Sequence, residues 1–471
     1  KGKIMGATAQ RCFDECTFVI LGATGDLTKR KLIPAIYKLI AEQKLCKFAI
    51  VGASFDTVTV QDILAQAKFF VPAANPEIWQ KLEKAFYFYS MDFYNARAYV
   101  GFCSLLNNVE KENNLVGNRV FYFATLPKHF ITITQNLVQS CIVKKSTKDQ
   151  LQNSSVWTRL VYEKPFGDDL SSSKKINKYL ASVFDESQIF RIDNYLGKEL
   201  VGTIPLTRFT NKILEPLWNN KHIDSVHINL SENLGIQNRG LYYDNYGAIK
   251  DMVQSHMLQL MGLTTMEAPE SLSARAIRDA KAAVFKKVII EKVVVGQCDD
   301  YTKEKSVASD SQTETYVAIK ASVNNKRWRG VPFYLTTGKY LSKKESSIRL
   351  NFKRVKCLLN TCPSVPNYFI VKIFPVEGMS FGVNAKVPGS SYEVTPVEMD
   401  FCHGCLFGPN TPESYETLLS DVIKGDQSAF VRSDEVESSW RIVKQIEALK
   451  GPLCIYKKES QGPVQAQEIY K

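Results

Sequence analysis

A short apolar run that leads directly into two glycines is the feature that most constrains the fold of this chain. Residues 18–21 (F-V-I-L) predict a buried strand, and Gly22 and Gly25 follow it, before a helical stretch in which Pro34 stands near the first turn. Gly22 permits a tight turn, and Gly25 lets backbone N–H groups approach a pyrophosphate at the positive end of the helix dipole. The spacing G-x-x-G is shorter than the full dinucleotide fingerprint, so a glycine turn that holds no ligand is the alternative.

The N-terminal third continues with predicted strands separated by predicted helices. Such alternation is typical of right-handed βαβ units and a parallel sheet. The predicted strands lie at residues 17–21, 48–51, 86–90, 120–125 and 156–162.

The pattern changes at about residue 223, where strands follow one another with few helices between them. Several strands alternate apolar and polar residues, as a half-buried antiparallel sheet does. We therefore expect an α/β Rossmann-like parallel-sheet domain over residues 11–193 and a larger α+β domain with a mostly antiparallel sheet over residues 194–471. The predicted strands lie at 226–230, 288–295, 315–323, 333–337, 348–352 and 368–375, and the predicted helices at 248–266, 415–423 and 433–449.

The charge balance narrows the class of partner. Sixty Lys and Arg residues against forty-eight Asp and Glu residues give a formal net charge of +12, which favours anionic partners. The chain has no dense basic run interleaved with aromatic residues and no apolar run of eighteen residues, so we expect neither a nucleic-acid nor a membrane partner. Scattered positive charge favours a small phosphorylated molecule.

The eleven cysteines are irregularly spaced, and the first residues contain no apolar leader core. Both observations predict a cytoplasmic protein with free thiols. The motif C-H-G-C at residues 402–405 is the exception, but a metal site needs a second ligand pair, and only Cys357 and Cys362 are near in sequence. We expect no metal, and instead interpret residues 399–407 as a strand whose sulfur-containing side chains pack.

The end of the second predicted strand, residues 51–56, normally contacts the adenosine ribose. Asp56 in this segment is able to accept hydrogen bonds from a ribose diol, which suits NAD, and no arginine is present there to pair with the 2′-phosphate of NADP. A role for Asp56 as a loop residue or helix cap is equally open.

Longer motifs occur in order along nearly the whole chain, and together they resemble the glucose-6-phosphate dehydrogenase family. They are the loop at 22–27 with Lys31, E-K-P-F-G at 163–167, R-I-D-N-Y-L-G-K-E at 191–199, N-R-G at 238–240, D-M-V-Q-S-H at 251–256, G-K at 338–339 and F-V-R-S-D-E at 430–435.

The resemblance implies oxidation of β-D-glucose 6-phosphate at C1 to 6-phosphoglucono-δ-lactone, the first step of the oxidative pentose phosphate pathway, by a homodimer or homotetramer. Loss of hydride from C1 requires a base for the C1 hydroxyl proton, and His256 matches the base of the family. Asp193 matches the carboxylate that orients the imidazole. Without the resemblance, His256 would be interpreted as a histidine packed in the core.

The resemblance also implies the binding residues. The predicted substrate contacts are Lys164, Asn194, Tyr195, Lys198, Glu232, Asp251 and Lys339. Asp56 is added as the predicted contact to the ribose diol. The predicted cofactor contacts are then Gly22, Ala23, Thr24, Gly25, Asp26, Leu27, Lys31, Asp56, Lys164 and Pro165.

The chain departs from the family at three positions. Asn194 replaces a histidine that grips the substrate phosphate, and Phe55 replaces the arginine that binds the 2′-phosphate. Thr336 replaces an arginine of a structural NADP site found in some relatives, so we predict no such second site. The expected cofactor is NADP, with NAD possible because of Phe55.

These losses leave a non-catalytic homologue, acting as a regulatory or scaffolding partner in oligomers, as the alternative function. Retention of Asp193, His256, Lys164 and Lys198 favours the enzyme.

Overall fold

The computed structural model contains two compact units. The structure describes residues 12–145, 156–356, 358–359, 363, 365–390, 392–408 and 412–471. The first unit comprises Lys1–Gly197 together with Pro412–Ser433, and the second comprises Lys198–Thr411 together with Asp434–Lys471. The return of residues 412–433 to the first unit has no counterpart among the expectations from sequence.

The first unit is built on a seven-stranded sheet with the order β15-β6-β5-β4-β1-β2-β3. All neighbouring strands are parallel except β15, which pairs antiparallel with β6. The order of the six parallel strands is that of the doubly wound dinucleotide-binding fold, so the predicted fold class is confirmed for this unit. The strands are β1 Cys16–Leu21, β2 Phe48–Ser54, β3 Phe86–Ser90, β4 Arg119–Phe123, β5 Thr158–Tyr162, β6 Ile189–Ile192 and β15 Phe430–Val431.

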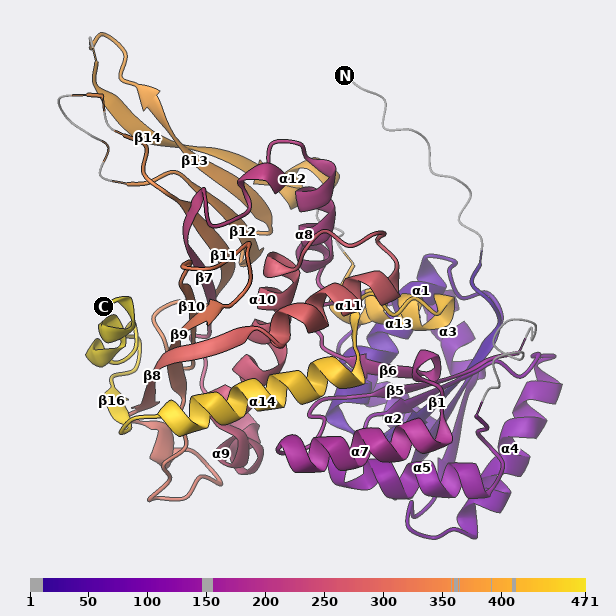
Figure 1. Cartoon of the computed structure of the whole chain (residues 1–471). Helices are drawn as coiled ribbons and strands as arrows, with labels where there is room; N and C mark the ends of the chain where they lie inside the picture. The colour runs from indigo at the N-terminus through magenta and orange to yellow at the C-terminus, as the bar shows by residue number, and fades with distance from the viewer. Residues whose placement is uncertain are drawn as a thin grey trace, which may run out of the picture. The chain divides into compact units, whose positions relative to one another are not determined.

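Helices cover both faces of this sheet (Figure 1). Side chains of α1, α2, α3 and α13 pack in one core with alternate residues of β1 and β4, such as Phe18, Ile20, Val120 and Tyr122. Since side chains alternate across a strand, Phe121 and Phe123 face the other layer. The helices are η1 Thr28–Leu32, α1 Ile33–Ala41, α2 Val60–Lys68, α3 Pro76–Lys84, α4 Ala98–Glu112, η2 Pro127–His129, α5 Phe130–Gln139, α7 Leu170–Val183, η3 Glu186–Gln188 and α13 Ser414–Lys424.

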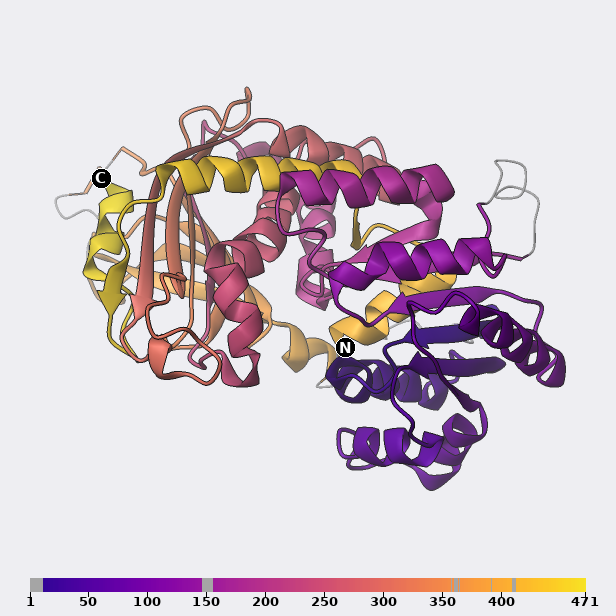
Figure 2. The ribbon, with the colours of Figure 1, turned by 90° about the horizontal axis from the view of Figure 1, so that it is seen from below.

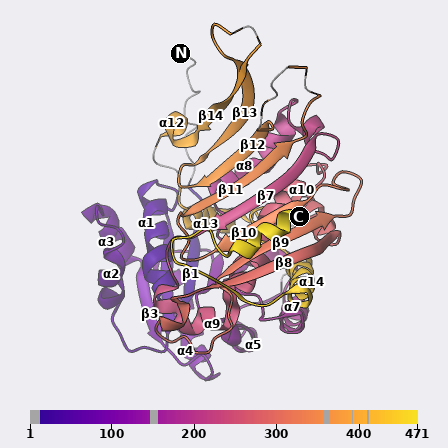
Figure 3. The ribbon, with the colours of Figure 1, turned by 90° about the vertical axis from the view of Figure 1, so that its left-hand side faces the viewer.

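The second unit is built on a nine-stranded sheet with the order β14-β13-β12-β11-β7-β10-β9-β8-β16 (Figure 3). Only the pairs β7–β10 and β8–β16 are parallel, which agrees with the expected mostly antiparallel sheet. The strands are β7 Ile223–Ser231, β8 Val288–Cys298, β9 Tyr316–Val323, β10 Phe333–Gly338, β11 Glu345–Phe352, β12 Tyr368–Phe374, β13 Gly378–Lys386, β14 Val394–Cys402 and β16 Cys454–Tyr456.

Long helices cover one face of this sheet, and the C-terminal helix η8 lies against β8 and β9 on the other face (Figures 1 and 2). No helix among the described residues has both the length and the apolar character needed to cross a bilayer. The helices are α8 Glu199–Thr210, η4 Glu215–Leu217, η5 Gln237–Arg239, α9 Gly240–Ala248, η6 Ile249–Met257, α10 Leu258–Thr265, α11 Ala274–Phe285, η7 Tyr301–Lys303, α12 His403–Phe407, α14 Ser433–Leu449 and η8 Val464–Tyr470.

Two expectations about the cysteines are wrong. Residues 399–407 do not form one strand, because β14 ends at Cys402 and α12 begins at His403. The thiols are not all free, because disulfides join Cys402 to Cys405 and also Cys12 to Cys46. Cys357 and Cys362, the other candidate ligands, lie outside the described residues.

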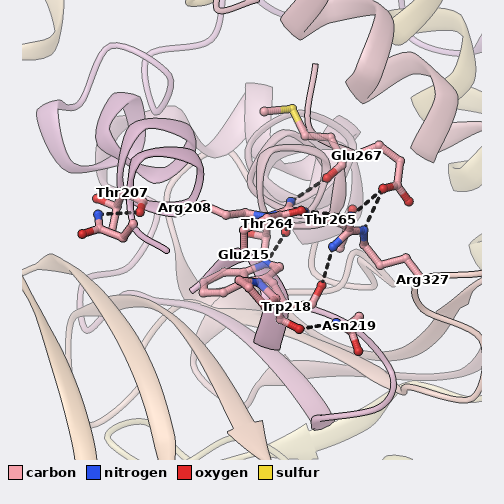
Figure 4. A network of polar contacts seen from close by, with 12 residues as sticks. Thr207, Arg208, Glu215, Trp218, Asn219, Thr264, Thr265, Glu267 and Arg327 are labelled. Carbon is pink, nitrogen blue, oxygen red and sulfur yellow. Dashed lines mark hydrogen bonds and ion pairs between the residues drawn. The ribbon is translucent and has the colours of Figure 1, made fainter. Parts of the chain in front are cut away.

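The last turn of α10 is capped by buried side chains (Figure 4). Arg208 of α8 donates to the carbonyl oxygen of Thr264 at 3.3 Å, and the indole of Trp218 donates to the same oxygen at 2.7 Å. The indole of Trp328 donates to the carbonyl oxygen of Thr265 at 2.8 Å. Because the last carbonyls of a helix have no partner within it, these three donors supply what the buried helix end requires.

We expect Arg208→Ala to lower the free energy of unfolding by about 3 kcal/mol. Arg208 is fully buried and pairs at 2.5 Å with the partly exposed Glu215, so its removal breaks this ion pair and uncaps α10. The measurement is urea or thermal unfolding of the full chain. Arg275→Ala is the control, because Arg275 is exposed and its ion pair with Asp279 is long, at 3.8 Å. We expect this control to change the free energy of unfolding by less than about 0.5 kcal/mol.

Candidate active site

The loop after β1 has a backbone that only glycine adopts easily. Gly22 has φ +99°, and a Cβ atom at this position would lie 2.5 Å from the carbonyl oxygen of Ala124. The amide of Gly22 donates to Ala53 on β2 at 2.8 Å, and its carbonyl accepts from the hydroxyl of Thr28 at 3.1 Å. The turn is therefore tied both to the sheet and to the first turn of η1, as a phosphate-binding loop requires.

The predicted site residues of the first unit follow strands that share one carboxyl edge. The loop 22–27 follows β1, Asp56 follows β2, Lys164 follows β5, and Asp193 follows β6. These four strands are parallel in one sheet, so their carboxyl ends point to the same edge. Ligands of doubly wound sheets bind along that edge where the strand order reverses, here between β1 and β4.

Asp56 is held by two hydroxyl groups. Thr24 Oγ1 donates to Asp56 Oδ2 at 2.5 Å, and Ser54 Oγ lies 3.3 Å from the same oxygen. Phe55 points to solvent, with 76% of its surface exposed. The end of β2 therefore presents a fixed carboxylate with a phenyl ring beside it, in place of a cationic side chain.

The remaining residues of the phosphate loop lie at the start of η1, which is a π-helix. Leu27 caps η1, and Asp26 pairs with Arg30 at 3.5 Å. Lys31 Nζ lies 3.2 Å from Glu413, near the start of α13, and both side chains are exposed. The amide of Ala23 donates to the carbonyl oxygen of Ala53 at 3.1 Å. The side chain of Ala23 packs in the core of the first unit.

Lys164 and Pro165 directly follow Glu163, which accepts hydrogen bonds from two tyrosines. The hydroxyls of Tyr122 and Tyr415 both donate to Glu163 Oε1, the second at 3.3 Å. Burial raises the pKa of Glu163. This cluster was not predicted from sequence. Alternation in β4 could have placed Tyr122 on this face, but no local pattern connects Tyr415 to residue 163.

Asp193 is fully buried at the end of β6. Its Oδ1 accepts the backbone N–H of Tyr195 at 3.0 Å, which shapes the turn that carries the predicted phosphate contacts. Asn194 in that turn has a buried side-chain oxygen with no hydrogen bond among the described residues. The preceding Arg191 pairs with Glu186 at 2.5 Å and is buried, so the arginine of this motif supports the strand.

In the second unit, Glu232 and Lys339 lie side by side because their strands are parallel. Gly338, the last residue of β10, is in register with Ser231, the last residue of β7. The next residue on each strand is therefore a neighbour of the other, and Lys339 forms an ion pair with Glu232. Lys339 is buried, and its Nζ lies 5.2 Å from the centre of the Tyr243 ring.

Asp251 and His256 lie on η6, which like η1 is a π-helix, and both are buried. The expected helix at 248–266 is present, but its first half has the wider π geometry, which often occurs at functional sites. Gly247, with φ +62°, interrupts the helical backbone before η6. Glu314 then accepts the amide of Ile249 at 3.2 Å and fixes the start of the π-helix.

The Asp251 carboxylate has contacts with two neighbouring side chains. The hydroxyl of Tyr242 donates to it at 3.4 Å, and Arg239 Nη2 lies 3.8 Å away. Burial and the nearby Asp251 charge raise the pKa of Tyr242, which therefore stays a donor. The N-R-G motif that contains Arg239 thus stands beside the predicted substrate carboxylate.

Lys198 stands at the N-cap of α8, and its carbonyl accepts from Val201 at 3.0 Å. Asp193 belongs to the first unit and His256 to the second, so their pairing stays a prediction. The part of the chain that the structure describes contains no group of three or more metal-binding side chains.

Comparison with known proteins places both units in one family. The sequence model "Glucose-6-phosphate dehydrogenase, NAD binding domain" matches residues 19–202, and "Glucose-6-phosphate dehydrogenase, C-terminal domain" matches residues 205–471. The glucose-6-phosphate 1-dehydrogenase of Chlamydia pneumoniae is 38% identical over 93% of this chain and 90% of its own length. That of Bacillus subtilis is 36% identical over 97% of this chain and 96% of its own.

Solved structures show the same similarity. A glucose-6-phosphate dehydrogenase in complex with its substrate glucose 6-phosphate superimposes with a TM-score of 0.87 at 32% identity, covering 98% of each chain. The glucose-6-phosphate 1-dehydrogenase of Mycobacterium avium superimposes with a TM-score of 0.83 at 31% identity, covering 97% of each chain.

Proposed function

Because the chain belongs to the glucose-6-phosphate dehydrogenase family, we propose that it oxidises β-D-glucose 6-phosphate at C1 to 6-phosphoglucono-δ-lactone, with a nicotinamide dinucleotide as hydride acceptor. The observation that carries the proposal is that both domains of the family match in sequence, one after the other, from residue 19 to residue 471. The same resemblance supports a cytoplasmic homodimer or homotetramer.

In this proposal His256 accepts the proton of the C1 hydroxyl, and Asp193 orients its imidazole. Lys164, Asn194, Tyr195 and Lys198 supply donors to the phosphate and the sugar. The bound dinucleotide supplies a nicotinamide ring that takes up the hydride.

Two carboxylates complete the proposed sugar site. Glu232 and Asp251 accept hydrogen bonds from the sugar hydroxyls. The ion pair with Lys339 orients the Glu232 carboxylate.

The experiment that tests the proposal is formation of reduced dinucleotide from glucose 6-phosphate with purified full-length chain, with NAD and NADP supplied separately. Turnover with either cofactor supports the enzyme. No turnover by folded protein at saturating substrate would favour the regulatory or scaffolding homologue instead.

We expect His256→Asn to lower kcat by a factor of about 10² to 10⁴, with little change in KM for glucose 6-phosphate, because it removes a general base without removing a substrate contact. Steady-state kinetics measure both constants. His222→Asn is the control, because His222 is exposed at the start of the second sheet. Near-normal turnover by the His256→Asn variant would exclude the His256 imidazole as the general base.

For the cofactor, we propose that this chain uses NAD at least as well as NADP. Asp56, fixed by Thr24 and Ser54, suits the ribose diol of NAD. The same carboxylate repels a 2′-phosphate, and Phe55 supplies no positive charge to offset that repulsion.

We expect the double substitution Phe55→Arg and Asp56→Ser to raise the ratio of kcat/KM for NADP over NAD by about ten- to hundredfold, since it adds one charge-assisted hydrogen bond worth ~1.5–3 kcal/mol. Phe69→Arg is the control, because it adds the same charge at another exposed position of the first unit. A wild-type chain whose kcat/KM for NADP exceeds that for NAD would contradict the proposal.

A further inference from the structure

The two hydrogen bonds to Glu163 come from elements that are far apart in the sequence. Tyr122 lies on β4, 41 positions before Glu163, and Tyr415 lies on α13, 252 positions after it. Both tyrosines are buried, and both hydroxyls donate to the same carboxylate oxygen. We call these three residues the phenol–carboxylate cluster.

Helix α13 is fixed to strand β5 at both ends. Tyr415, in its first turn, donates to Glu163, the residue after β5 ends. At the other end, Arg159 near the start of β5 donates to the carbonyl oxygen of Val422 at 2.6 Å. Seven residues of helix rise about 10 Å and four residues of strand about 13 Å, so the two contacts fit one antiparallel alignment of helix and strand.

Apolar packing and an ion pair hold α13 in this alignment. Leu418, Leu419 and Val422 are buried in the core of the first unit. Glu416 is almost fully buried and pairs with Lys38 of α1 at 2.6 Å. The hydroxyl of Tyr415 is therefore presented to Glu163 by a rigid element.

The cluster lies next to predicted catalytic groups. Lys164 and Pro165 follow Glu163 directly in the chain. Burial, then the Glu163 charge, then the Asp193 charge raise the pKa of Tyr415. Burial likewise raises the pKa of Tyr122, so both phenols keep their protons and remain donors across the neutral range.

We propose that the phenol–carboxylate cluster positions Lys164 in the active site, and that Tyr415 is therefore a positioning residue contributed by the segment that returns from the second unit. This inference rests on the proposed function for the role of Lys164. Glu163 directly follows β5, and two donors on one oxygen restrict the rotation of its side chain. The backbone that leads into Lys164 is thereby held at the carboxyl edge of the sheet. A role in stability alone would be served equally well by apolar packing at these positions.

The test uses the full chain with Tyr415→Phe, Tyr122→Phe and the double variant. Each substitution removes one hydroxyl and keeps the ring. Tyr162→Phe is the matched control, because Tyr162 immediately precedes Glu163, is equally buried and bonds Thr134 at 2.9 Å, but belongs to the other face of the sheet. We measure kcat, KM, the melting temperature and the Kd for reduced dinucleotide by its fluorescence.

We expect kcat/KM for glucose 6-phosphate to fall about tenfold in Tyr415→Phe and further in the double variant, since a hydrogen bond to a carboxylate is lost each time. Tyr162→Phe should lower the melting temperature by a similar amount and leave kcat/KM within twofold of wild type. Glu163→Gln, which keeps the accepting oxygen, should retain more activity than Glu163→Ala.

If Tyr415→Phe matches Tyr162→Phe in every constant, the cluster serves stability alone and the inference is overturned, while the proposed function stands. If the wild-type chain turns over no glucose 6-phosphate, the proposed function fails, and the Kd for reduced dinucleotide decides the inference. Weakening of that Kd by threefold or more in Tyr415→Phe, but not in Tyr162→Phe, supports it, and an unchanged Kd overturns it.

Discussion

Parallel strands deliver the residues that follow them to a single edge of the sheet, and the first unit depends on this constraint. The loops after β1, β2, β5 and β6 contribute the phosphate loop, Asp56, Lys164 and Asp193. Residues as far apart in sequence as Gly22 and Asp193 therefore lie along one edge of the sheet. The tight turn at Gly22 and the N-terminus of η1 lie at that edge, and the positive end of a helix dipole attracts an anion.

The second unit uses the same constraint on a smaller scale. Its sheet is mostly antiparallel, yet the central pair β7–β10 is parallel, and this pair places Glu232 next to Lys339. An antiparallel pair would have put the residues after the two strands at opposite edges. The π-helix η6 packs against both strands and carries Asp251 and His256, so four predicted site residues depend on one parallel pair inside an antiparallel sheet.

Local patterns of apolar and polar residues predicted many strands of the two sheets. Apolar runs identified the first five strands and the strands from β7 to β12, because each buries side chains on at least one face. β14 was not predicted as a separate strand, since most of its residues are exposed and its alternation is weak. The π geometry of η6 and the positions of Tyr122 and Tyr415 around Glu163 depend on contacts with distant residues, which no window of sequence contains. For the same reason, the motifs identified candidate site residues but not the residues that support them.

The returning segment shows why long-range contacts matter for the first unit. Its residues Leu418, Leu419 and Val422 fill a core that α1 and β1 cannot close alone. Bringing them back requires closure of a loop of more than two hundred residues, which costs entropy that only the completed core offsets. The part of α1 that contacts α13 is therefore covered only by this returning segment. The Tyr415 contact with Glu163 depends on the same return, so the side-chain cluster that precedes Lys164 requires the chain as far as α13.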